Sequence, residues 1–247
     1  MWKQEKIVKW LSAIPLFKDM TREELTLFAD VAQIQPYKKK KHIFMEGDQL
    51  EHIFFICDGK VKVYKKNPTG KEFIIYVLEP GEMFPYIGFM RKGSHISYAE
   101  VLEDTYVISI PIKHFEEILV FFPKLCMKIF NCLGERITDL EERLEGHLFH
   151  DTYEKIILLL IRLCQSNGEQ IEKGYKLKTK FTCSDLAKMI GTSRETVCRT
   201  ITELKQKKYV FINREGYYYI DKDSLKQKLY SENEQYGNQL FYKAYGG

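Results

Sequence analysis

The sequence predicts an α+β protein with an N-terminal antiparallel β-roll of jelly-roll type, a long helix and a C-terminal winged helix. Three observations predict this class. Turn glycines separate short strand-like runs in the first half of the chain. An apolar stripe at helical spacing begins at Pro123. Two short amphipathic segments joined by a glycine precede a hairpin near the C-terminus.

The first half of the chain has the pattern of a small antiparallel β structure. A short helix comes first, because Thr21 can cap it and Glu24 can reach back to the cap. Glycines then recur 11 or 12 residues apart, at Gly47, Gly59, Gly70 and Gly81. The strand-like runs are Ile53–Ile56, Val61–Tyr64, Phe73–Val77 and Tyr106–Ile110. Short strands at this spacing predict a barrel or jelly roll.

A helix of about 25 residues follows Pro123, with one narrow apolar stripe. The stripe can pack on its own domain or pair with a second copy of the chain. A packed surface helix usually has a wider stripe, so we expect pairing. The expected interface residues are Phe130, Leu133, Ile137, Leu140 and Leu144.

We expect residues Gly146–Asp151 to break this helix and form a hinge, with Asp151 capping a buried helix from Tyr153 to Gln165. The expected domains are a β-roll sensor (1–122), a dimerisation helix and hinge (123–150), a winged-helix domain (151–222) and a C-terminal helix and tail (223–247).

Composition places the chain in the cytoplasm. The six cysteines are scattered, with no Cys-x-x-Cys pair and no zinc-ligand spacing, so we expect no metal, no cofactor and reduced thiols. The N-terminus lacks the apolar segment of a secretory signal. The longest apolar run, Ile156–Ile161, is far shorter than the ~20 residues of a membrane span.

Positive charge is concentrated late in the chain. Residues 173–208 contain ten lysines and arginines against three acidic residues, while the whole chain has a net charge of only +4. Such a basic segment is typical of a nucleic-acid-binding module, although a solvated basic face would give the same count.

The same segment has the spacing of a helix-turn-helix. Thr182 can cap a first helix, and Ala187 is small where two helices must cross closely. Gly191 permits a left-handed turn, and Ser193 can cap a second helix. The second helix has an apolar side formed by Val197, Ile201 and Leu204. A hairpin follows as a wing, with Arg214 at its tip in position to contact a phosphate.

The other side of the second helix presents Arg194, Glu195, Cys198 and Arg199. An arginine can bond O6 and N7 of guanine together, and a carboxylate can accept from the amine of cytosine. The alternative for the arginines is phosphate contact without sequence reading. The alternative for Glu195 is a capping box with Thr192. We expect base reading by all three charged residues. The predicted DNA-binding residues are Thr182, Ser193, Arg194, Glu195, Cys198, Arg199 and Arg214.

The run Ser193-Arg194-Glu195-Thr196-Val197-x-Arg199, placed after a glycine-punctuated β-roll and a long helix, resembles the Crp/Fnr family of bacterial transcription regulators. The resemblance extends from Met20 to Ser224. It implies a homodimer that binds a double-stranded DNA operator with TGTGA-like inverted half-sites about one helical turn apart. It also implies RNA polymerase as a partner, and either activation or repression.

The sensor half departs from the family pattern. Members that bind cyclic AMP have Gly-Glu-Leu and Arg-Ser where this chain has Pro85-Tyr86-Ile87 and Ile96-Ser97, and this chain has Leu140-Glu141 where hydroxyl side chains meet adenine. The resemblance therefore implies a degenerate effector pocket that lacks the phosphate-binding arginine. Its members are Pro85, Tyr86, Ile96, Ser97 and Leu140. The Phe84-Pro85 variant resembles regulators of the arginine deiminase pathway.

Several alternatives stay open. An iron–sulfur sensor is not expected, because Cys57 is the first cysteine. Three alternatives for the control of activity stay open. The first is constitutive activity, with Tyr86 and Ile96 filling the pocket. The second is binding of an effector other than cyclic AMP, and the third is oxidation of Cys57, Cys183 or Cys198. A competing hypothesis makes the β-roll a small-molecule sensor with vestigial DNA binding. An enzyme is not expected, since no nucleophile–base pair, phosphate-binding loop or metal motif is visible.

Overall fold

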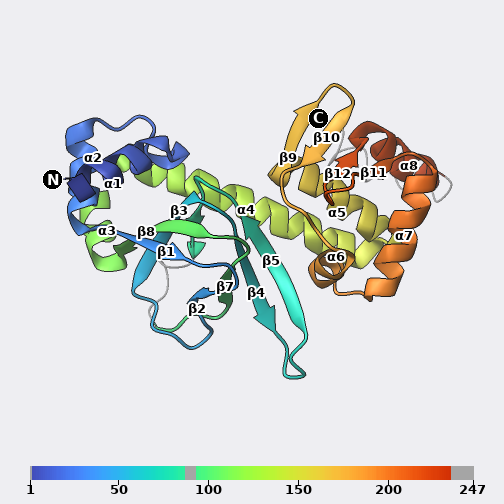
Figure 1. Ribbon diagram of the computed structural model, residues 1–247, viewed down its shortest axis with the longest axis horizontal. Helices are drawn as coiled ribbons and strands as arrows, with labels where there is room; N and C mark the ends of the chain where they lie inside the picture. Colours follow the sequence, from blue (N-terminus) through green and yellow to red (C-terminus); the bar gives the residue numbers. More distant parts are fainter. Residues whose placement is uncertain (1, 87–92, 235–247) are drawn as a thin grey trace. The chain divides into compact units, whose positions relative to one another are not determined.

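The computed structural model describes residues 2–86 and 93–234. The chain divides into two compact units, Met1–Glu141 and Glu142–Gly247, and the division falls within the long helix α4 (Pro123–Phe149; Figure 1). Helices and sheets occur in both units, as expected for an α+β protein.

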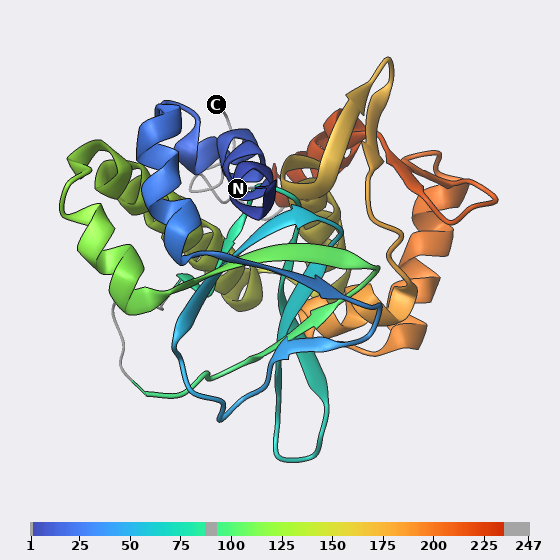
Figure 2. The same ribbon diagram turned by 60° about the vertical axis from the view of Figure 1, so that its left-hand side comes forward.

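The first unit contains two four-stranded antiparallel sheets, with strand orders β1-β8-β3-β6 and β2-β7-β4-β5 (Figure 2). All four strand-like runs predicted from the sequence lie in strands of these sheets. The strands are β1 (Gln33–Tyr37), β2 (His42–Phe44), β3 (His52–Asp58), β4 (Val61–Lys66), β5 (Glu72–Leu78), β6 (Met83–Phe84), β7 (Tyr98–Val101) and β8 (Thr105–Pro111).

Helices cover the outside of the β1-β8-β3-β6 sheet. The capping box predicted for α2 (Arg22–Val31) is confirmed, with the Thr21 hydroxyl and the Glu24 carboxylate each accepting from the other's backbone N–H. A helix that the sequence analysis did not predict, α1 (Trp2–Ala13), precedes it and buries Ile7 and Leu11. The remaining helices are η1 (Pro15–Phe17) and α3 (Ile112–Leu119).

Two apolar cores hold this unit together. One lies between the two sheets and includes Phe54, Ile56, Val63 and Phe84. The other joins the helices to β3 and β8 and includes tilted aromatic rings in contact, with 5.1 Å between the ring centroids of Phe17 and Phe28. Burial of large side chains on both faces of one sheet explains why strand β3 is apolar along most of its length.

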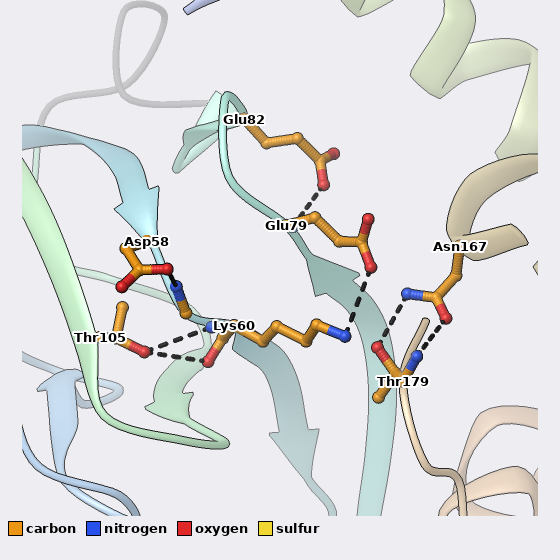
Figure 3. A network of polar contacts seen from close by, with 8 residues as sticks. Asp58, Lys60, Glu79, Glu82, Thr105, Asn167 and Thr179 are labelled. Carbon is orange, nitrogen blue, oxygen red and sulfur yellow. Dashed lines mark hydrogen bonds and ion pairs between the residues drawn. The ribbon is translucent and has the colours of Figure 1, made fainter. Parts of the chain in front are cut away.

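The turn between β3 and β4 depends on a close backbone approach. Gly59 has φ of +87°, and a Cβ at this position would lie 2.3 Å from Oγ1 of Thr105. The Thr105 hydroxyl accepts from the Lys60 backbone N–H at 3.2 Å, and Lys60 Nζ lies 3.6 Å from a carboxylate oxygen of Glu79 (Figure 3). Only glycine fits this turn without strain.

The expectation that α4 breaks at Gly146 is wrong. The helix continues to Phe149, and only His150 and Asp151 separate it from α5 (Thr152–Asn167). A glycine inside a helix costs only about 1 kcal/mol relative to alanine, and a Cβ at Gly146 would make an ordinary contact with Leu158 at 3.6 Å, so nothing at this position forces a break. The break is set instead by Asp151, whose carboxylate caps α5 as predicted.

The second unit is a winged helix. Helix α5 is largely buried beside a four-stranded sheet of order β11-β12-β10-β9. Buried Asn167, at the end of α5, donates to Thr179 Oγ1 at 2.8 Å and accepts from the Thr179 backbone N–H at 3.0 Å (Figure 3). These bonds fix the chain just before the helix-turn-helix. The tail from 235 to 247 lies outside the described residues. The elements are β9 (Gly168–Ile171), β10 (Gly174–Leu177), α6 (Cys183–Ile190), α7 (Arg194–Gln206), β11 (Val210–Ile212), β12 (Tyr218–Ile220) and α8 (Lys222–Glu234).

Candidate nucleic-acid interface

Helix α6 starts where the sequence predicts. The Thr182 hydroxyl accepts from the Asp185 backbone N–H at 3.1 Å, and the Asp185 carboxylate accepts from the Thr182 backbone N–H at 2.8 Å. This capping box satisfies two N–H groups that a helix start leaves without intrahelical partners. The Thr182 side chain is therefore occupied as a cap.

The turn between α6 and α7 has the predicted left-handed glycine. Gly191 has φ of +83°, and its N–H donates to the Ala187 carbonyl at 2.8 Å. Ala187 is buried, as the close crossing of the two helices requires. The position of α7 in the fold thus depends on one glycine and one small residue.

Helix α7 is capped by Ser193, whose side chain accepts from the Thr196 backbone N–H at 3.1 Å. The alternative capping box between Thr192 and Glu195 does not form. The cap lies one residue later than that box requires, so the third helical position is Thr196 and the Glu195 carboxylate is not needed to close a box.

The two sides of α7 are clearly divided. Val197, Ile201 and Leu204 are buried in the unit, as predicted. Arg194, Glu195 and Arg199 are exposed, and Cys198 between them is half-buried. The charged side chains are therefore available to a ligand, while the apolar side fixes the helix.

Glu195 is held in its charged form. A hydrogen bond from its own backbone N–H, then one from the Ser193 side chain, lowers the pKa of the Glu195 carboxyl below its usual value. The carboxylate remains exposed. At neutral pH it is an acceptor flanked by two arginines, which suits an exocyclic amine and repels a phosphate.

The predicted wing forms between β11 and β12. The Asn213 side chain accepts from the backbone N–H groups of Glu215 and Tyr217, at 3.1 and 2.9 Å, and Gly216 has φ of +93°. This Asx-type turn leaves Arg214 exposed at the tip. The phosphate contact itself stays a prediction.

The structure adds basic residues that the motif does not include. Lys176 Nζ and Lys180 Nζ lie 4.9 and 4.7 Å from the centroid of the Tyr217 ring, one from β10 and one from the segment before α6. In the sequence, these two lysines are marked only by the overall positive charge of residues 173–208. Only the fold shows that these two cations gather around Tyr217, the last residue of the turn before β12.

Two cysteines of the helix-turn-helix are free thiols. Cys183, the first residue of α6, and Cys198 of α7 are both half-buried. Burial raises the pKa of the Cys183 thiol to about 11.

The predicted effector-pocket residues differ in their exposure. Pro85 is buried after a cis peptide bond, Tyr86, Ile96 and Ser97 are half-buried, and Leu140 is exposed on α4. Ile87, quoted with them, lies outside the described residues.

Arg136 of α4 is the cation beside Tyr86, and no sequence pattern pointed to this residue. Its guanidinium donates to the Tyr86 hydroxyl at 2.6 Å and pairs with the Glu82 carboxylate. It also lies 5.1 and 4.8 Å from the ring centroids of Tyr76 and Tyr86. Burial raises the pKa of Tyr86, so its hydroxyl stays protonated.

The predicted interface stripe on α4 is largely exposed. Phe130, Ile137, Leu140 and Leu144 are all exposed in the single chain, whereas Leu133 is half-buried and packs against the core of its own unit. An exposed apolar stripe on a long helix is unusual for a surface that faces only water.

Comparison with known proteins agrees with this architecture. Residues 34–120 match the cyclic nucleotide-binding domain, and residues 154–228 match the Crp-like helix-turn-helix domain. The global nitrogen regulator of Nostoc sp. is 26% identical over 183 residues, covering 73% of this chain and 82% of that protein. The anaerobic regulatory protein of Bacillus subtilis is 24% identical over 229 residues, covering 92% and 96%.

The fold also has solved counterparts. The structure of FixK2 from Bradyrhizobium japonicum superposes with a TM-score of 0.69 at 19% identity, covering 80% of this chain and 96% of that one. The two domain matches, together with the relatives of the chain, define a DNA-binding transcription regulator. The chain belongs to the Crp/Fnr family.

In the described part of the chain every helix is too short or too polar to cross a membrane. Among the same residues no group of three or more His, Cys, Asp or Glu side chains is placed to hold a metal ion.

Proposed function

We propose that the protein is a cytoplasmic homodimer that recognises a TGTGA-like inverted repeat. The observation that carries this proposal is the exposure of Arg194, Glu195 and Arg199 on one side of α7, opposite a fully packed apolar side. Two guanine-seeking guanidinium groups and one cytosine-seeking carboxylate match the donors and acceptors of a TGTGA half-site in the major groove.

The exposed apolar stripe on α4 supports the proposed dimer. A second copy would cover Phe130, Ile137, Leu140 and Leu144, which the single chain leaves in water. Leu133, also predicted at the interface, is half-buried and packs in part against the core of its own unit. Pairing two recognition helices places them on two half-sites, as an inverted repeat requires.

Cyclic AMP does not fit the sensor unit. A cyclic phosphate needs an unpaired cation, but the Arg136 guanidinium is already engaged by Glu82 and by the Tyr86 hydroxyl. An incoming phosphate would meet the Glu82 carboxylate at close range and lose the charge-assisted bonds that such ligands depend on. Ile96 stands where the family's phosphate-binding arginine is expected and offers no hydrogen-bond donor from its side chain. We infer that cyclic AMP leaves operator binding unchanged.

RNA polymerase is the partner through which the bound dimer acts, as an activator in the proposed role. The competing reading, a small-molecule sensor with vestigial DNA binding, gives no reason for the charged residues to remain on α7. It predicts no preference among duplex sequences.

A binding-site selection on the purified protein, with and without cyclic AMP, tests the operator and the effector together. We expect TGTGA-like inverted repeats in both selections. Selection of no sequence rejects the operator. A repeat that appears only with cyclic AMP rejects the effector inference.

Two arginine variants separate base reading from phosphate contact. Arg199→Ala should weaken binding to the selected repeat by about 10- to 100-fold and relax the preference at one base pair. Arg214→Ala should weaken binding to all duplexes similarly and reduce the salt dependence. Equal discrimination by wild type and Arg199→Ala, measured by fluorescence anisotropy, would show that Arg199 does not read a base.

A further inference from the structure

The Arg136 side chain joins α4 to three separate parts of the β-roll. Tyr76 lies in β5, Glu82 in the turn between β5 and β6, and Tyr86 just after β6. The guanidinium pairs with the Glu82 carboxylate, donates to the Tyr86 hydroxyl at 2.6 Å and lies over both tyrosine rings. All of these residues belong to the first unit. A single cation of the helix therefore connects α4 to the β-roll.

The site that receives this guanidinium is built from residues that other contacts hold in place. One oxygen of the Glu82 carboxylate pairs with the guanidinium, and the other accepts from the Glu79 backbone N–H at 2.7 Å (Figure 3). The Glu82 carbonyl accepts from the Ile56 backbone N–H of β3 at 3.0 Å. The Tyr76 and Tyr86 rings pack edge to face, with 6.0 Å between centroids. The carboxylate and the two rings thus form a guanidinium site whose geometry the β-roll itself fixes.

Arg136 lies one turn beyond the apolar contact between α4 and its own unit. Leu125 and Ile129 are buried, and Leu133 is half-buried against the same core. Steps of four, four and three residues from Leu125 to Arg136 place these side chains on one side of the helix. Ile137, the next residue, is 56% exposed. The contact of Arg136 therefore continues the attachment of α4 past its apolar segment and orients the exposed stripe.

The charged contact is strong because it is partly shielded from water. The Arg136 and Glu82 side chains are only 26% and 30% exposed. Burial lowers the pKa of Arg136, but the oxygens of Tyr86 and Glu82 raise it by more, so the guanidinium stays charged. A planar guanidinium bonds along fixed directions, whereas an apolar side chain can slide or rotate against its neighbours. The contact therefore fixes both the rotation of α4 and its position along its axis.

We propose that Arg136 is a positioning residue whose guanidinium takes the place of a small-molecule effector, holding α4 on the β-roll so that the exposed stripe is presented to a second copy of the chain. Removal of this side chain should leave a vacant guanidinium site in the β-roll. The pairing part of the inference rests on the proposed function, whereas the guanidinium site does not.

The test removes the guanidinium and then supplies it from solution. Arg136→Ala should raise the dissociation constant of the dimer about 10- to 100-fold, the loss expected for hydrogen bonds to a charged group, and should weaken operator binding with it. Methylguanidinium chloride at millimolar concentration should restore most of the pairing and raise the thermal unfolding midpoint of the variant. Sedimentation equilibrium without added nucleotide measures pairing, fluorescence anisotropy measures operator binding, and scanning calorimetry measures the midpoint.

The controls separate the guanidinium site from a general effect of charge or fold. Methylammonium chloride at the same concentration supplies a cation without the planar fork and should restore nothing. Arg136→Ala combined with Glu82→Gln removes the carboxylate as well and should not respond to methylguanidinium. Arg22→Ala removes an ion pair with Glu5 in which both side chains are more than half exposed, and should behave as wild type.

Each outcome decides the inference. A dimer of Arg136→Ala as stable as that of wild type overturns the positioning role. Loss of pairing that methylguanidinium does not restore overturns it too, because damage to the fold would then explain the loss. An unchanged midpoint overturns the guanidinium site. If wild type is a monomer at every concentration, the proposed dimer and the positioning role both fail, and the midpoint still decides whether the β-roll binds a guanidinium.

Discussion

His95 shows how a single buried residue links stability to pH. It is 5% exposed, and its ring stacks on Phe44 with 3.6 Å between centroids. Burial lowers the pKa of His95 from 6.5 to about 4, and the charge of Asp48 opposes only part of this shift. The folded protein therefore holds His95 neutral, whereas the unfolded chain protonates it near its ordinary pKa.

The free energy of unfolding should fall as the pH drops from about 6.5 to about 4, since the unfolded state binds the extra proton in this window. The contribution of His95 is on the order of 3 kcal/mol and is fully present above pH 6.5. Urea unfolding at several pH values measures it. His95→Phe keeps an aromatic ring against Phe44 but cannot titrate, so its stability should depend less on pH.

Burial also lowers the pKa of His147. His147→Gln is therefore the control for the part of the acid-dependent loss of stability that comes from this second histidine. Parallel pH profiles for wild type and His95→Phe would assign the acid sensitivity to other groups.

Single residues also mark the limit of sequence reasoning. Caps depend on neighbours three residues away, and Thr21, Asp151, Thr182 and Ser193 all cap the helices for which they were predicted. The ion pair of Arg136 with Glu82 joins residues brought together only by the tertiary fold. No local pattern encodes such pairs.

At the scale of elements, the strands follow from the sequence because turn glycines and β-branched runs are local signals. Their pairing does not. Strand β8 lies between β1 and β3, which are far from it in the chain. The hairpin of β9 and β10 was not predicted either, since its short, polar strands are defined by pairing with each other and with β12.

Helix ends show the same division. The start of α5 follows from Asp151, but the end of α4 at Phe149 does not follow from Gly146, which lies inside the helix. The inward position of Leu133 likewise depends on which domain α4 packs against. A heptad pattern alone cannot distinguish a core position from an interface position.

The turn of the helix-turn-helix gives a prediction about one element. A Cβ at Gly191 would meet nothing within 4 Å, so the only cost of Gly191→Ala is the left-handed backbone at φ of +83°. We expect the substitution to lower the free energy of unfolding by about 1–2 kcal/mol. Thermal unfolding of the second unit measures the loss.

Gly191→Asn is the matched variant, because asparagine tolerates this conformation better than alanine. It should recover part of the stability and of the operator affinity. Equal stability of Gly191→Ala and wild type would show that the turn can adopt another conformation.

At the scale of the whole molecule, the exposed stripe on α4 is the surface that the proposed dimer would bury. Ile137 is 56% exposed and Leu144 is 61% exposed in the single chain. In a two-fold symmetric dimer each substitution occurs twice at the same interface. Ile137→Glu would therefore place two carboxylates in a surface that is otherwise apolar, where an unpaired charge is costly.

We expect Ile137→Glu to be a monomer, by analytical ultracentrifugation, at concentrations where the wild type is a dimer. Its operator affinity should fall by about 100-fold or more, because one recognition helix cannot bind both half-sites. Its circular dichroism should match wild type, since the side chain is already exposed. Glu135→Lys changes the charge at another exposed position of α4, outside the stripe, and should remain dimeric. A dimer that persists in Ile137→Glu would mean that the copies pair elsewhere, and the half-site spacing would then have to follow from a different two-fold axis.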